Sequence, residues 1–174
     1  MSKGRSQGMR EWLARSKVEG LRQWPTIERL VAEAAKVPEV AGVIVIGSFA
    51  AGSADPVSDV DLFVVAEEGD FEAAWEKRKH LSGPGLLTSW ENRTKDRPDV
   101  GLYVWLNQDL VLVEALFCTH ASARLAELAP AVVVVGSADL LDGFRRRPPV
   151  RRSEMSFTNE VEKAYQRLKS AIRK

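Results

Sequence analysis

Apolar residues recur at two different spacings along the chain, and the spacing separates the predicted helices from the predicted strands. Spacings of three and four residues are typical of a helix with one buried face. They predict helices over 9–18, from Pro25 to about residue 37, over 71–80, over 121–128 and over 139–144. A C-terminal helix is expected with one apolar face made of Val161, Ala164, Tyr165, Leu168 and Ile172.

Short runs rich in β-branched residues are typical of buried strands. They predict strands over 41–46, 60–65, 86–90, 101–106, 110–117 and 131–135. The strands over 101–106 and 110–117 flank Asn107-Gln108-Asp109, a segment that favours a hairpin. Together the two patterns predict an α+β fold, a mixed β-sheet with flanking helices.

The chain length suits one main domain with helical extensions. Its 174 residues lie within the usual range of about 100–200 residues for one domain, and a hydrophobic content of 45% is enough for a core. We predict an N-terminal helical arm over 1–24, a main domain over 25–144, and a basic linker with the C-terminal helix over 145–174.

Charge is balanced in total but not along the chain. The net charge of +1 argues against a protein that binds nucleic acid in bulk. Basic residues outnumber acidic ones by eight to four over 1–36 and by ten to three over 143–174, whereas the middle holds seventeen acids and seven bases. The chain therefore has an acidic centre between basic ends.

Cysteine content and hydropathy exclude several further classes. A single cysteine, Cys118, excludes a disulfide framework and a cysteine-based zinc site. No apolar run reaches the roughly 18 residues of a membrane helix, and the polar start of the chain lacks the core of a signal peptide. We expect a cytoplasmic protein with no membrane contact.

The segment from Gly47 to Leu62 carries the strongest chemical signal. Gly47 follows a predicted strand and allows the backbone to approach a ligand closely, and Ser48 offers a hydroxyl and an N–H group to phosphate oxygens. Asp59 and Asp61 are two residues apart at the start of the next strand, so both side chains are expected on one face of the sheet. Two such carboxylates repel each other unless a cation binds between them, and Mg²⁺ prefers carboxylate and phosphate oxygens.

A third acid, Glu114, lies in the middle of an apolar predicted strand. Because a buried carboxylate without a partner is costly, Glu114 needs a metal or a positive group nearby. A strand placed beside the one with Asp59 and Asp61 would bring three carboxylates to one surface. A salt bridge from Glu114 to Arg93 or Arg97 is the alternative.

The Gly-Ser turn followed by Ser58-Asp59-Val60-Asp61-Leu62 resembles the nucleotidyltransferase superfamily of DNA polymerase β. The likeness is greatest to the small bacterial branch, which includes aminoglycoside and lincosamide nucleotidyltransferases and minimal nucleotidyltransferase antitoxins. Glu114 stands where the family usually has an aspartate, and only about thirty residues follow the core, where the resistance enzymes carry a sizeable helical domain.

The resemblance implies a transferase that moves a nucleoside monophosphate onto a hydroxyl of a small molecule or a protein and releases pyrophosphate. It implies that Asp59, Asp61 and Glu114 bind Mg²⁺ or Mn²⁺, with Glu114 as third ligand or as base, and that Gly47, Ser48 and Ser58 bind the phosphates of ATP or another nucleoside triphosphate. Two alternatives are an antitoxin-like partner of a small helical toxin and a pseudoenzyme that binds nucleotide without transfer. A homodimer is a further expectation, from the apolar faces of the terminal helices.

Overall fold

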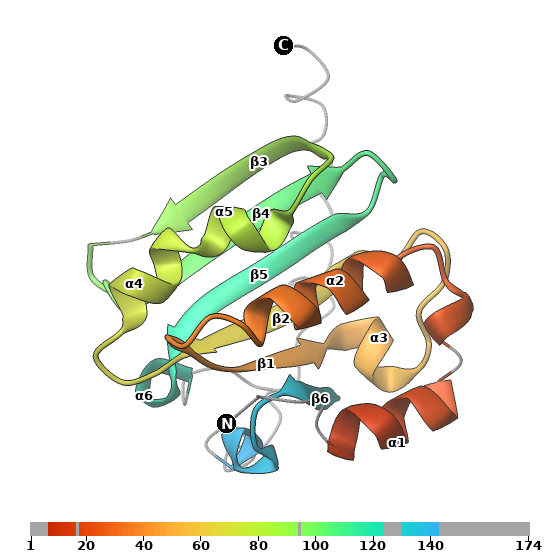
Figure 1. Cartoon of the computed structure of the whole chain (residues 1–174), viewed down its shortest axis with the longest axis horizontal. Helices are drawn as coiled ribbons and strands as arrows, with labels where there is room; N and C mark the ends of the chain where they lie inside the picture. Colours follow the sequence, from red (N-terminus) through yellow and green to blue (C-terminus); the bar gives the residue numbers. More distant parts are fainter. Residues whose placement is uncertain (1–6, 17, 94, 124–129, 143–174) are drawn as a thin grey trace, which may run out of the picture.

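All six predicted strands are present in the computed structural model, which describes residues 7–16, 18–93, 95–123 and 130–142. They form one mixed sheet in the order β3-β4-β5-β2-β1-β6 (Figure 1). Only the β2–β5 pair is parallel, and the other four pairs are antiparallel. The predicted α+β class is therefore confirmed. The strands are β1 (Val40–Ile46), β2 (Val60–Ala66), β3 (Leu86–Arg93), β4 (Val100–Asn107), β5 (Leu112–Thr119) and β6 (Ala131–Val135).

The helices follow the predicted order with three differences. The helix expected over 71–80 is two short helices that meet at Lys77, and the segment after β6 forms a 3-10 turn rather than an α-helix. A further short helix begins at Gly47, directly after β1. The bounds are α1 (Gln7–Ser16), η1 (Val18–Gly20), α2 (Trp24–Ala34), α3 (Gly47–Ala51), α4 (Phe71–Glu76), α5 (Arg78–Ser82), α6 (His120–Ala123) and η2 (Ala138–Leu141).

Two predicted segments reach beyond this part of the chain. The helix expected over 121–128 can be followed only to Ala123, and the basic linker and C-terminal helix expected over 145–174 lie outside the described residues. None of the helices that the structure describes is long and apolar enough to span a lipid bilayer.

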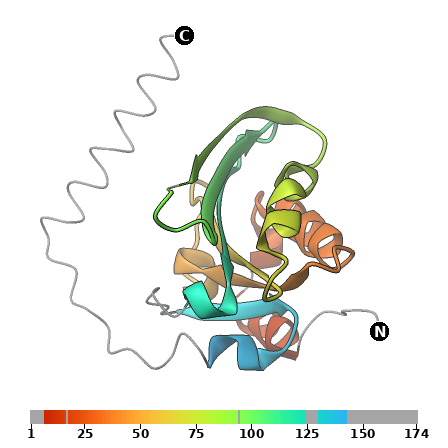
Figure 2. The ribbon, with the colours of Figure 1, turned by 90° about the vertical axis from the view of Figure 1, so that its left-hand side faces the viewer.

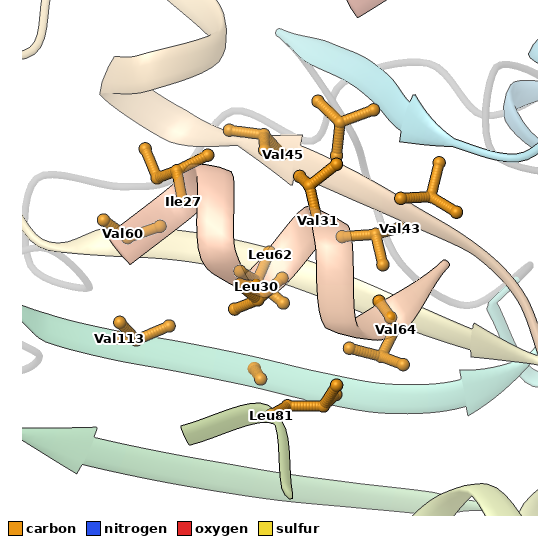
Figure 3. Packing of buried hydrophobic residues seen from close by; sticks show 14 of the residues in the cluster. Ile27, Leu30, Val31, Val43, Val45, Val60, Leu62, Val64, Leu81 and Val113 are labelled. Atoms are coloured by element: carbon orange, nitrogen blue, oxygen red, sulfur yellow. The ribbon is translucent and has the colours of Figure 1, made fainter. Parts of the chain in front are cut away.

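The main core lies between one face of the sheet and the helices α2, α4 and α5, which Figure 2 shows on one side of the strands. Alternate residues of β1 and β2 point into this core, and α2 covers them with residues at helical spacing (Figure 3). Pro25 in the first turn of α2 is compatible with the helix because its missing N–H is not needed there. Met9 and Trp12 of α1 are buried in the same cluster, so α1 packs against the sheet domain.

Among the described residues, other elements cover only part of the opposite face of the sheet. A smaller apolar cluster joins β1, β2 and β6 to Leu141 of η2. On β5, the residues that point to this face (Leu112, Glu114 and Leu116) are half-buried, whereas the intervening Val113, Ala115 and Phe117 are buried in the main core. The acids therefore lie on the more accessible face of the sheet.

Candidate active site

Asp61 and Glu114 lie side by side on adjacent strands. The parallel pairing of β2 with β5 places Asp61 opposite Glu114, and neighbouring strands in a sheet are about 4.8 Å apart. Asp59 lies two residues before Asp61, immediately ahead of β2. All three side chains belong to half-buried residues. The fold thus brings together three acids that are separated by up to 55 positions in the sequence.

The electrostatics of the three acids agree with this arrangement. Burial, together with the negative charges of Asp59 and Glu114, raises the pKa of Asp61 to about 7. A carboxyl group with such a pKa is half-protonated near neutral pH, and a cation beside it would favour the ionised form. The site therefore has the negative charge that attracts a cation.

Gly47 is close to the same carboxyl group. The residue has a positive φ of +67°, a conformation that favours glycine, and a Cβ atom added to it would lie 2.9 Å from Oδ2 of Asp61. The Gly47-Ser48 turn and the Asp61 carboxylate therefore line the same small region, as the sequence predicted. Ser48 follows in the first turn of α3 and is half-buried.

The loop between α3 and β2 is held by two sets of hydrogen bonds. The hydroxyl of Ser58 donates to Oδ1 of Asp55 at 2.8 Å and accepts from the backbone N–H of Asp55 at 3.0 Å. These bonds, with the N–H of Val57, lower the pKa of Asp55. The Ser58 hydroxyl is thus engaged in shaping the loop, and its contact with phosphate stays a prediction.

Gln23 is a site-supporting residue that sequence reasoning missed. Its side chain is fully buried, and its Nε2 donates to the backbone carbonyls of Asp55 at 2.9 Å and Ser58 at 2.8 Å. Both bonds join the start of α2 to the loop that leads into Asp59. No local pattern indicates such a role, because the partners are 32 and 35 positions away.

Trp12 provides a second support from the N-terminal helix. Its indole Nε1 donates a buried hydrogen bond of 2.8 Å to the backbone carbonyl of Phe49 in α3. Phe49 is itself fully buried in the main core. Helix α3, with the Gly47-Ser48 turn at its start, is therefore fixed from α1 as well as from β1.

The two arginines considered as partners for Glu114 make other interactions. Arg93 forms a bidentate ion pair with Glu72, with Nη1 at 3.0 Å from one carboxylate oxygen. Arg97 donates to the backbone carbonyl of Ser122 at 3.5 Å. An ion pair of either arginine with Glu114, the alternative considered from the sequence, stays a prediction.

The donor set fits a metal that also takes ligands from a substrate. Within the described ranges, no group of three or more His, Cys, Asp or Glu side chains is already arranged to hold a metal ion. Mg²⁺ is usually bound by one or two carboxylates together with phosphate oxygens and water. Asp59 and Asp61 offer two hard oxygen donors, and the Gly47-Ser48 turn lies directly beside Asp61.

Comparison with known proteins gave one family match. Residues 27–106 match the family model described as a nucleotidyltransferase domain. The matched span runs from α2 to β4 and contains Gly47, Ser48, Ser58, Asp59 and Asp61, while Glu114 follows it. No curated protein matches the chain.

Proposed function

We propose, on the premise that this chain carries a nucleotidyltransferase domain of the DNA polymerase β-like superfamily, that it transfers AMP from ATP to a hydroxyl group and releases pyrophosphate. The observation that carries the proposal is the alignment of Asp61 with Glu114 across β2 and β5, beside a glycine turn that approaches Asp61 closely. Phosphoryl transfer depends mainly on positioning and on neutralisation of charge, and this arrangement offers residues for both.

Each residue then has a defined task. Asp59 and Asp61 hold a divalent cation, for which Mg²⁺ is the first candidate. Gly47 lets the turn lie against the Asp61 carboxylate, and Ser48 donates its hydroxyl and its backbone N–H to the terminal phosphates. When bound, the metal neutralises part of the triphosphate charge and orients the α-phosphate for attack.

The reaction balances with one acid acting as base. The acceptor hydroxyl oxygen forms a bond to the α-phosphorus, the bond from that phosphorus to the bridging oxygen breaks, and pyrophosphate departs with the electron pair. Glu114 takes the proton of the acceptor hydroxyl, since it lies beside Asp61 on the same face of the sheet. Binding as third metal ligand is the other role open to Glu114.

The test is transfer of label from α-³²P-ATP to a panel of hydroxyl compounds and proteins in the presence of Mg²⁺. The wild-type protein is compared with Asp59→Ala/Asp61→Ala and with Asp96→Asn, which removes one charge from an exposed turn outside the site. We expect transfer by the wild type and by Asp96→Asn, and none by the double variant. Transfer that survives the double substitution contradicts the assigned site.

Measurements of ATP binding distinguish between the remaining hypotheses. Calorimetry that shows Mg²⁺-dependent ATP binding by the wild type, without transfer to any acceptor, would indicate a nucleotide-binding pseudoenzyme. Absence of ATP binding would contradict both the transferase and the pseudoenzyme. The remaining hypothesis would then be an antitoxin-like partner protein, which copurification with a small helical protein would test.

A further inference from the structure

A partly exposed set of apolar side chains surrounds the fully buried Val104, between the carboxylates and the far edge of the sheet. Strand β5 carries two leucines on the same face as Glu114, and β4 carries two more on either side of its buried segment Tyr103-Val104-Trp105. All four leucines are half-buried, and one exposed tryptophan from β3 completes the row. We call this set the acceptor surface; it consists of Trp90, Leu102, Leu106, Leu112 and Leu116.

The side to which Trp90 points follows from its neighbours on β3. Glu91 forms an ion pair with Arg78 of α5 at 2.7 Å, and Arg93 pairs with Glu72 of α4. Alternate residues of a strand point to opposite faces, so Trp90, between these two positions, points away from the helices. It therefore shares the face of Asp61 and Glu114.

The register aligns Trp90 with the carboxylates. Trp90 pairs with Val104, Val104 with Glu114, and Glu114 with Asp61. At about 4.8 Å between neighbouring strands, Trp90 lies roughly 10 Å from Glu114 and roughly 14 Å from Asp61 along one straight line across the sheet. A small organic molecule spans such a distance.

Trp90 differs from the other four tryptophans of the chain in exposure. Its relative exposure is 39%, whereas those of the others (Trp12, Trp24, Trp75 and Trp105) lie between 0% and 8%. An exposed aromatic side chain beside half-buried leucines is typical of a binding surface for an apolar body.

The geometry of the reaction indicates which of the two substrates, the nucleotide or the hydroxyl acceptor, approaches this surface. The Gly47-Ser48 turn follows β1, on one side of β2, while Glu114, the leucines and Trp90 lie on the other side. In an in-line displacement the attacking and leaving oxygens are on opposite sides of the phosphorus. If pyrophosphate leaves towards Gly47-Ser48, the acceptor hydroxyl arrives from the side of β5, β4 and β3.

We infer that the acceptor surface binds the body of the hydroxyl substrate, and that this substrate is an alcohol with an apolar, aromatic body. The inference rests on the proposed function. The hydroxyl lies at Glu114, the apolar body packs on the leucines, and Trp90 stacks on its far end. The five residues of the surface carry no charge, so the surface itself contributes apolar and aromatic contact, and the nearest charges are the carboxylates of Asp61 and Glu114.

The experiment uses 3-phenylpropan-1-ol and glycerol as acceptor probes in the Mg²⁺-dependent transfer from α-³²P-ATP. Trp90→Ala is compared with Trp90→Phe, which keeps an aromatic ring, and with Ser89→Ala, which alters the preceding residue on the other face of β3. We expect Trp90→Ala to lower kcat/KM for the aromatic alcohol about tenfold, and Trp90→Phe by about twofold. Ser89→Ala should match the wild type, and no variant should change the rate with glycerol.

A second readout measures binding without turnover. 3-Phenylpropan-1-ol is titrated into the protein with and without Mg²⁺ and α,β-methylene-ATP. Bound alcohol should protect the tryptophan fluorescence of the wild type from quenching by acrylamide, because Trp90 is the exposed tryptophan. Protection should be lost in Trp90→Ala, while the Kd for the ATP analogue stays unchanged.

Failure of this inference is distinct from failure of the proposed function. A wild type that neither binds Mg²⁺ with the ATP analogue nor transfers label contradicts the proposed function. Transfer that proceeds equally in Trp90→Ala overturns the acceptor surface alone. A Trp90→Ala variant with a weakened Kd for the analogue and an unchanged KM for the alcohol also overturns it, since the surface would then hold the nucleotide base.

Discussion

The carboxyl group of Asp61 is buried beside two other acids, and this placement makes the stability of the metal-free protein depend on pH. The pKa of Asp61 is about 7 in the folded protein, against 3.8 for an ordinary aspartate. The folded chain therefore holds this proton more tightly than the unfolded chain. The free energy of unfolding should fall as pH rises from about 4 to about 7, by an amount of the order of 1–2 kcal/mol after allowance for solvent screening.

Asp61→Asn removes the charge and keeps the shape, so it should flatten this dependence and raise the Tm of the metal-free protein at pH 8. Thermal melts in a chelator, at pH 5 and pH 8, measure the effect, and Asp96→Asn at an exposed turn is the control. The same Asp61→Asn protein should lose transfer. A melt of Asp61→Asn that keeps the pH dependence of the wild type would contradict the burial and repulsion that we assign to Asp61.

Gly47 and Gly69 allow backbone strain to be separated from contact with Asp61. Both have positive φ, +67° and +91°, but a Cβ atom on Gly69 would have nothing within 4 Å, whereas one on Gly47 would lie 2.9 Å from Oδ2 of Asp61. Either change to alanine should cost about 1 kcal/mol of stability from the left-handed conformation. Only Gly47→Ala must also displace the Asp61 side chain.

We therefore expect Gly47→Ala to weaken Mg²⁺-dependent ATP binding at least tenfold and Gly69→Ala to leave it unchanged. Calorimetric titration of both variants makes the comparison, with thermal melts to match their stabilities. Equal affinity in the two variants would show that the Gly47–Asp61 contact has no part in binding.

The individual site residues were predicted from sequence to different degrees. Gly47, Ser48, Asp59 and Asp61 lie within one short segment, and strand periodicity was enough to place the two aspartates on one face. The alignment of Glu114 with Asp61 depends on the register of a parallel pair, which no local pattern specifies. Gln23 could not be found, because a buried amide that binds two distant carbonyls has no sequence signature.

Among the elements, the loop between α3 and β2 depends most directly on a helix that is distant in sequence. Gln23, at the start of α2, holds the carbonyls of Asp55 and Ser58. Gln23→Met keeps the length of the side chain and leaves both carbonyls without this donor, which should cost about 2 kcal/mol of stability. The loop that leads into Asp59 should loosen, and ATP affinity should fall several-fold.

Thr26→Val is the matched control for Gln23→Met. It removes a buried hydrogen bond of the same helix, from Nδ2 of Asn107 to Oγ1 of Thr26 at 2.8 Å, at the end of β4 and away from the loop. Denaturant melts should show a similar loss of stability in both variants, and calorimetry should show weakened ATP binding in Gln23→Met alone. Equal loss of affinity in both would mean that Gln23 acts through stability and not through the loop.

The elements themselves followed from periodicity, except where tertiary context decides. The helix expected over 71–80 breaks at Lys77. The apolar spacing continues across the break, because Trp75 before it and Leu81 after it are both buried. Strand β3 runs to Arg93 instead of stopping at residue 90, because Glu91 and Arg93 find partners on α5 and α4. The extension of β3 depends on contacts between elements, which a pattern along one segment does not contain.

At the scale of the whole molecule, the order of the strands brings acids from distant parts of the sequence close together. The acidic middle of the sequence forms the sheet domain, and its order places β2 between β1 and β5. Only the α+β class and the hairpin of β4 and β5 followed from sequence, because the single parallel pair depends on how the connections cross in space. If the proposed function holds, these carboxylates repel ATP alone, whereas ATP with Mg²⁺ carries the positive charge that complements them.

This coupling should appear in the stability of the whole domain. A ligand that binds only the folded state at a concentration of 100 times its Kd adds about 2.7 kcal/mol of stability, which corresponds to a rise in Tm of about 5–10 °C for a chain of this size. We expect that rise with ATP and Mg²⁺ together, little change with ATP in a chelator, and none with Asp59→Ala/Asp61→Ala under either condition. Differential scanning calorimetry at constant ionic strength measures all three. Equal stabilisation by ATP with and without Mg²⁺ would contradict a metal held by Asp59 and Asp61, because the nucleotide would then bind without the cation that we propose for these carboxylates.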